Sequence, residues 1–189
     1  MSGGRLDRFR RESLTTDQRE VYDAIVGGPR AKAASAVPLV DEEGGLEGPF
    51  NAFLLQPPLG NALQALGAAV RYETSLSTRA REVATLVVAG RRDCAFEWHA
   101  HEILGRAAGL TDDDLAAVRD GRYSSLPGHE SLIATVADAL VVDGDLDDEM
   151  YHSAEAALGP AAIFELTTLV GYYMALALQL RVFRVEPPP

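Results

Sequence analysis

Three side chains that can move protons or act as nucleophiles occur in one short stretch of the chain: Cys94, Glu97 and His101. An α-helix turns by about 100° per residue, so these side chains would form one stripe along a helix face, with Trp98 on the same side. Imidazole titrates near neutral pH, and a carboxylate beside it would fix its tautomer and raise its pKa. The stripe therefore indicates an acid–base site centred on His101.

The carboxylate partner of His101 is left open between two residues. Glu97 lies one helical turn before His101, and Glu82 lies on the preceding helix. Residues 90–93 form only a short turn, so the two helices should pack as an antiparallel hairpin that brings Glu82 near the stripe. The same residue types also fit a surface Glu–His ion pair beside a small buried Cys94.

Helices separated by short turns account for the rest of the sequence pattern, which predicts an all-α fold. A capping box at Thr15 opens the first helix, Ser77 is expected to cap the third and Asp93 the fourth. The expected helices cover about 15–26, 58–73, 78–90, 94–108, 111–120, 129–142, 147–158 and 161–180. Residues 30–50 are expected to be a loop, with one weak strand at 37–40. One structural domain is predicted, with 1–44 as an N-terminal helix and loop extension and 45–189 as the helical domain.

The helix predicted at 161–180 is long enough to span a bilayer and carries one charge, Glu165. Polar side chains are nevertheless scattered along it, and no segment rich in Lys and Arg flanks it. We expect a buried helix at the centre of a core or a subunit interface rather than a membrane span.

Composition excludes several classes of function. The formal charge of −11 argues against nucleic acid or an anionic membrane as a partner, because both need a basic surface. Cys94 is the single cysteine of the 189 residues, so an intrachain disulfide, a thioredoxin-like pair and a four-cysteine zinc site are impossible. The polar N-terminus lacks the apolar segment of a secretory signal, and a cytoplasmic location is expected.

The metal-binding patterns in the sequence are incomplete. Glu149 and His152 have the spacing used in di-iron bundles, but those sites need a second such pair. The acidic turn at 143–148 lacks the Glu that closes a calcium loop. His99 and His101 face different sides of one helix, which makes a matched ligand set hard to build. We therefore expect no metal and no cofactor.

The run Glu82-x11-Cys94-x2-Glu97-x3-His101 resembles the signature of the carboxymuconolactone decarboxylase and alkyl hydroperoxidase D-like superfamily. The segments GPFNAFLLQPP, EWHAHE before AAGL, and GYYMALALQLRVF are similar as well, and the resemblance covers about 45–186. It implies a helical bundle that assembles as a homo-oligomer, a trimer or a hexamer, with an active site near a subunit interface. It also implies a small-molecule substrate.

The resemblance implies two chemistries, of which one branch reduces peroxides with a dithiol. Glu97 stands where that branch has its second cysteine, so a dithiol cycle cannot run within one subunit. The other branch decarboxylates a carboxylated lactone of aromatic catabolism without a cofactor, and this is the expected activity. His101 would then supply the proton, and Glu82 or Glu97 would orient it.

Further roles follow from that expectation. Trp98 and Arg71 are predicted to bind the substrate, with Arg91 and Arg92 as further candidates for its carboxylate. Two alternatives to the decarboxylase-like enzyme remain. One is a peroxidase-like enzyme that uses Cys94 with an external thiol. The other is a non-catalytic helical oligomer in which the stripe only stabilises an interface.

Overall fold

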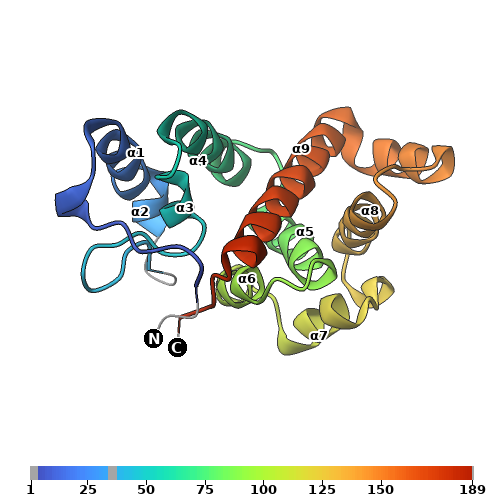
Figure 1. The fold of residues 1–189 in the computed structure, drawn as a ribbon. Helices are drawn as coiled ribbons and strands as arrows, with labels where there is room; N and C mark the ends of the chain where they lie inside the picture. The colour runs from blue at the N-terminus through green and yellow to red at the C-terminus, as the bar shows by residue number, and fades with distance from the viewer. Residues whose placement is uncertain (1–3, 34–37, 189) are drawn as a thin grey trace. The chain divides into compact units, whose positions relative to one another are not determined.

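The computed structural model describes residues 4–33 and 38–188, and these residues are helical, which confirms the all-α prediction (Figure 1). The helices are α1 Thr16–Val26, α2 Pro29–Ala33, α3 Phe50–Phe53, α4 Pro57–Tyr72, α5 Thr78–Arg91, α6 Ala95–Ala107, α7 Asp112–Asp120, α8 Glu130–Val142 and α9 Asp148–Phe183, with 3-10 turns at Arg11–Ser13 and Tyr123–Ser125. Part of the strand expected at 37–40 lies outside the described residues, and Val40 makes an isolated bridge with Leu46. Residues 30–50 were expected to form a loop, but residues 30–33 belong to α2.

Contacts within the chain form two compact units. The first runs from the N-terminus to Glu73 and includes the chain from Leu178 onward, and the second is Thr74–Ala177. Glu82, Cys94, Glu97 and His101 all lie in the second unit. The division of the chain into 1–44 and 45–189 stays a prediction.

In the first unit, α4 packs against α1, α2 and α3. The capping box predicted at Thr15 is confirmed, since its side chain accepts from the Gln18 backbone N–H and the Gln18 side chain returns a bond to the Thr15 backbone. Ile25 of α1 is fully buried. The capping residues therefore place the start of α1 where the sequence pattern predicts it.

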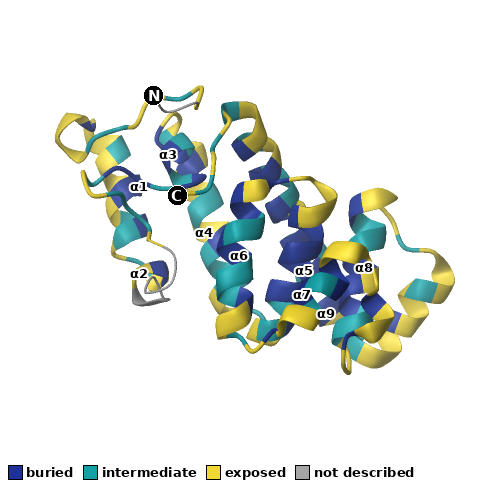
Figure 2. Ribbon diagram, turned by 90° about the horizontal axis from the view of Figure 1, so that it is seen from below, coloured by how far each residue is buried: buried dark blue, intermediate teal, exposed yellow. Residues whose placement is uncertain are grey.

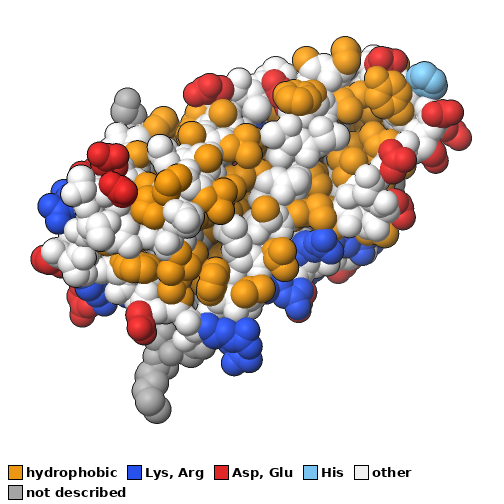
Figure 3. Space-filling view, turned by 45° about the horizontal axis from the view of Figure 1, so that its top comes forward, with side chains coloured by type: hydrophobic (Ala, Val, Ile, Leu, Met, Phe, Trp, Pro, Cys, Tyr) orange, Lys and Arg blue, Asp and Glu red, His pale blue; other side chains and the backbone are white. Residues whose placement is uncertain are grey.

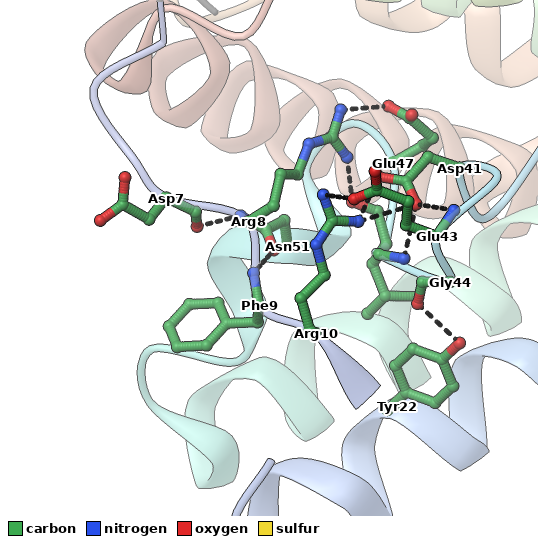
Figure 4. Close-up of polar contacts among 12 residues, drawn as sticks. Asp7, Arg8, Phe9, Arg10, Tyr22, Asp41, Glu43, Gly44, Glu47 and Asn51 are labelled. Carbon is green, nitrogen blue, oxygen red and sulfur yellow. Dashed lines mark hydrogen bonds and ion pairs between the residues drawn. The ribbon is translucent and has the colours of Figure 1, made fainter. Parts of the chain in front are cut away.

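The N-terminal segment of this unit, around residues 7–10, is held to residues 41–51 by polar contacts (Figure 4). The buried Asn51 side chain accepts from the Phe9 backbone N–H at 3.0 Å and donates to the Asp7 carbonyl at 3.0 Å. Arg10 pairs with Asp41 at 3.1 Å, and the Tyr22 hydroxyl donates to the Gly44 carbonyl at 2.9 Å. These bonds satisfy the backbone of a segment that has no regular structure of its own.

In the second unit, α5 is the central helix and packs against α6, α7 and α8. Its residues from Glu82 to Ala89 are all buried, and Figure 2 shows most of the helix in the colour of buried residues. The predicted cap is confirmed, since the Ser77 side chain accepts from the Ala80 backbone N–H. A carboxylate such as Glu82 on so buried a helix requires a partner.

Arg79 joins the start of α5 to its neighbours. Its guanidinium pairs with Glu130 on α8 at 2.7 Å and with Asp114 on α7 at 2.9 Å, and it also donates to the Gly109 carbonyl. One side chain thus fixes the start of α5 against α7, α8 and the end of α6.

The turn between α5 and α6 differs from the prediction at one residue. Asp93 does not cap α6, because its backbone adopts a left-handed conformation, with φ of 49°. Cys94 is the N-cap residue instead, with extended φ and ψ and no side-chain capping bond. Asp93 therefore serves to reverse the chain, and α6 begins one residue later than the sequence pattern indicated.

Helix α9 bends at Gly159, whose φ of 81° and ψ of 161° are not helical, and Pro160 restarts the helix. The predicted break at this Gly–Pro pair is confirmed.

Among the described residues, α9 is the one helix long and apolar enough to cross a membrane by length and composition, with a mean hydropathy of 1.5 in its most apolar window. Half of that window is buried inside the protein, as expected for a core helix.

Two helical glycines differ in the space around them, which gives a stability test. A Cβ added at Gly60 on α4 would lie 2.1 Å from the Phe53 carbonyl oxygen, whereas a Cβ at Gly171 on α9 meets nothing within 4 Å. We expect Gly60→Ala to lower the free energy of unfolding by about 2–3 kcal/mol. Gly171→Ala should raise it by up to about 1 kcal/mol, through helix propensity. Urea unfolding of both variants measures this, and equal effects would contradict the packing at Gly60.

Candidate functional site

The second unit brings Glu82 and His101 into direct contact, as the predicted hairpin requires. The Nδ1 atom of His101 lies 2.6 Å from Oε2 of Glu82, and both side chains are about 95% buried. The contact crosses from α5 to α6, so it depends on how these two helices pack. A hydrogen bond this short between buried groups is typical of one with a charged partner.

The second ring nitrogen of His101 is occupied as well. Its Nε2 atom lies 3.2 Å from Oε2 of Glu97, one helical turn earlier on α6, and the Glu97 side chain is 5% exposed. The sequence left the partner of His101 open between Glu82 and Glu97, and the structure uses both. The three side chains form a buried relay, Glu82–His101–Glu97, in which each imidazole nitrogen faces a carboxylate.

Tyr173 is a site residue that the sequence analysis missed. Its ring lies 5.0 Å from the His101 ring, centroid to centroid, at 87°, and its side chain belongs to α9. The sequence offers one signal, a Tyr172–Tyr173 pair in an otherwise apolar helix. Helical periodicity alone does not tell which distant helix such a pair will face.

The surroundings of His101 set its charge. Burial by itself lowers the pKa of His101, but the electrostatic influence of Tyr173 and Glu82 and the hydrogen bonds to Glu82 and Glu97 outweigh it and raise the pKa to about 10. A tyrosine adds negative charge only once its hydroxyl is ionised, so near neutral pH the two carboxylates are the main cause. His101 is therefore an imidazolium at neutral pH.

Cys94 lies at the N-terminus of α6 and is 3% exposed. Because its φ and ψ are extended, it stands just before the helix and not on the regular stripe that the sequence predicted. Its backbone carbonyl accepts from the Trp98 N–H at 3.0 Å and so starts the helix. The thiol therefore lies buried at the N-terminus of α6.

Trp98, a predicted substrate-binding residue, is half-buried where α6 meets α7. Its Nε1 donates to Glu102 at 3.0 Å, and the Arg119 guanidinium lies 4.5 Å from the centre of its ring. These contacts fix the indole in place. Substrate binding by Trp98 stays a prediction.

The candidate cations for a substrate carboxylate fall in different places. Arg71 lies in the last turn of α4, in the first unit, and stays a prediction. Arg91, at the end of α5, forms an ion pair with Asp138 on α8, with a second bond of 3.1 Å. That pairing makes Arg91 a structural residue of the second unit rather than a free cation.

The described residues contain no group of three His, Cys, Asp or Glu side chains arranged to hold a metal ion. His152 is exposed and its Nδ1 lies 3.7 Å from Glu155, a contact within one helix surface. The pairing of both His101 nitrogens with carboxylates is an arrangement for holding and moving a proton.

Comparison with known proteins identifies a family that matches part of the chain. The carboxymuconolactone decarboxylase family matches residues 57–125, a segment that contains all of α5 and α6. A comparison with curated protein sequences gives no significant match.

Solved structures share the fold at low sequence identity. A peroxidase-related protein from Ralstonia eutropha JMP134, described as an alkylhydroperoxidase AhpD core, is similar with a TM-score of 0.77 at 13% identity, over 98% of this chain and 92% of that one. A peroxidase-related protein from Silicibacter sp. TM1040 gives a TM-score of 0.75 at 14% identity, over 100% and 93%. The debrominase Bmp8 gives 0.72 at 12% identity, over 96% and 90%.

The raised pKa of His101 predicts a pH dependence of stability. Because the folded protein binds this proton more tightly than the unfolded chain, whose histidine pKa is near 6.5, the stabilisation is complete below pH 6.5 and is lost as the pH rises to about 10. We expect the difference in unfolding free energy between wild type and His101→Asn to shrink over this range. Urea unfolding at several pH values measures it, with His129→Asn, at an exposed site, as the control. A constant difference would show that His101 does not hold a proton in the folded protein.

Proposed function

We propose that this chain, in which residues 57–125 match the carboxymuconolactone decarboxylase family, is a cofactor-free acid–base enzyme. Its substrate in this proposal is a small carboxylated or lactone-type molecule. The observation that carries the proposal is the buried relay, in which His101 lies between Glu82 at 2.6 Å and Glu97 at 3.2 Å. Similarity to this family suggests the class of substrate, and the buried relay suggests acid–base chemistry.

The relay suits the proton step of a decarboxylation. When a carboxylated unsaturated lactone loses CO₂, the carbon–carbon bond breaks and its electron pair enters a dienolate. The dienolate then takes one proton at carbon, and water later returns a proton to the enzyme. No electrons are exchanged with a cofactor, so a positioned acid is sufficient.

The two contacts of His101 indicate the direction of proton movement. Both ring nitrogens face carboxylates, so a proton that leaves His101 must pass to Glu82 or to Glu97. The contact to Glu82 is the shorter one and lies on the buried stretch of α5, which suits a group that orients and charges the ring. Glu97 is held at the longer distance, in the first turn of α6, and is the better candidate for the group that meets the substrate.

Burial strengthens the electrostatic interactions among the three side chains of the relay. Each of the three side chains is at most 5% exposed, so water screens their interactions little. Charges that are already oriented in such a site stabilise a transition state without further reorganisation.

We also propose that the enzyme is a homo-oligomer, a trimer or a hexamer, that binds no nucleic acid. Large apolar side chains support this: Phe164 on α9 is 72% exposed, Leu178 on α9 is 66% exposed and Leu59 on α4 is 58% exposed. Figure 3 shows hydrophobic side chains at the surface.

Release of CO₂ from a series of carboxylated unsaturated lactones tests the activity. We expect His101→Asn and Glu97→Gln to lower kcat at least about 100-fold, because each interrupts the relay. Glu155→Gln, at an exposed site on α9, should stay within about twofold, and Cys94→Ala should retain most of the activity. Full turnover in the relay variants would exclude these residues from the reaction, and a wild type inactive on every lactone would refute the decarboxylase-like activity.

A second candidate rests on Cys94, a thiol at the N-terminus of α6. A similar structure is that of a cysteine-to-alanine variant of the debrominase Bmp8 in complex with 2,3,4-tribromopyrrole. In this alternative the Cys94 thiolate breaks the O–O bond of a hydroperoxide, which leaves an alcohol and a sulfenic acid. An external thiol then forms a mixed disulfide with loss of water, and a second thiol releases Cys94.

Hydroperoxide consumption with an external thiol separates the two candidates. Under the acid–base proposal neither the wild type nor Cys94→Ala consumes peroxide above the uncatalysed rate. Consumption by the wild type that is lost in Cys94→Ala would establish Cys94 as the nucleophile.

A further inference from the structure

Three helices meet at His101, and the third contributes an aromatic ring. Tyr173 on α9 is 4% exposed, and its ring is nearly perpendicular to the imidazole at 5.0 Å. Tyr172 lies edge-on to Tyr173 at 5.3 Å and 79°. The ring that contacts His101 is therefore itself held by a second buried ring.

The two hydrogen bonds of His101 depend on the orientation of its ring. A tilt of the ring turns both N–H directions away from the carboxylate oxygens and weakens both bonds. A third contact on the imidazole, from an element other than those that carry Glu82 and Glu97, adds to the restraint on the ring plane.

We propose that Tyr173 is a positioning residue of the relay, whose ring holds the His101 imidazole in the plane where one nitrogen meets Glu82 and the other meets Glu97. The use of this geometry in catalysis rests on the proposed function. The geometry itself does not, because it concerns the resting protein.

The geometry of the contact is a favourable one for two rings. The perpendicular arrangement is one that pairs of aromatic rings favour, and it places a large buried side chain against the imidazole. Each of the three helices contributes one side chain that faces His101: Glu82 from α5, Glu97 from α6 and Tyr173 from α9. Loss of the ring removes the contact from α9 and leaves both carboxylates in place.

A merely structural role for Tyr173, as a large side chain that fills the core, is separable by a matched variant. Tyr123 lies in the same unit, is 8% exposed and bonds to Asp138 at 3.1 Å. Tyr123→Leu removes a buried tyrosine of the same size without touching His101. If Tyr173 only fills space, Tyr173→Leu and Tyr123→Leu should have the same effect on the relay.

Nuclear magnetic resonance of protein labelled with ¹⁵N in its histidine rings measures the N–H signals and the titration of His101 without any substrate. We expect Tyr173→Phe, which keeps the ring, to retain the wild-type Nδ1–H signal of His101. Tyr173→Leu should lose or broaden that signal and lower the titration midpoint of His101 by about one pH unit. Tyr123→Leu should leave both unchanged. Where a lactone substrate is turned over, Tyr173→Leu should lower kcat on the order of tenfold with little change in KM.

Two results would overturn the proposal: wild-type signals in folded Tyr173→Leu, or loss of the signal in Tyr173→Phe. The second result keeps the test decisive if Tyr173→Leu does not fold, because removal of one hydroxyl preserves the packing. A wild type inactive on every lactone would refute the proposed function, while the resonance measurements would still decide the role of Tyr173.

Discussion

The pairing of one buried imidazole with two buried carboxylates is the constraint on which the second unit depends. A carboxylate on a helix as buried as α5 is costly unless a charge and a hydrogen bond meet it. His101 supplies both to Glu82, and it does the same for Glu97. His101 therefore makes the burial of both carboxylates possible, and its removal leaves two carboxylates in the core with no cation between them. The same contacts therefore determine both the chemistry of the site and the packing of α5 against α6.

The rest of the second unit serves to hold that arrangement. Ser77 sets the first turn of α5, and Arg79 ties that turn to α7, α8 and the end of α6. Helix α9 brings Tyr173 to the remaining side of the imidazole. The ion pairs of Arg79 are partly buried and join three helices. Their value here is geometric, because they keep the helix that carries Glu82 in one position.

Much of this was predictable from the sequence, since it rests on local signals. Capping residues, Gly–Pro breaks and apolar spacing located the helices, and the short turn after Gly90 predicted that Glu82 and His101 would meet. The choice between Glu82 and Glu97 could not be predicted, because one imidazole has two nitrogens and spacing does not show that both are used. Tyr173 was missed because its approach depends on how α9 packs. Asp93 was wrongly taken as a cap, since capping residues also favour the left-handed turns that precede helices.

The left-handed backbone at Asp93 reverses the chain within a short turn, so both the length of the α5–α6 turn and the residue at position 93 matter to the site. One inserted or deleted residue there would rotate α6 by about 100° and move it by about 1.5 Å along its axis. His101 would then turn away from Glu82, while Glu97 would turn with it and stay beside the imidazole. Among natural variants of this chain, changes in the length of the turn should therefore be rare, and position 93 should be held by Asp, Asn or Gly, which adopt the left-handed conformation most readily.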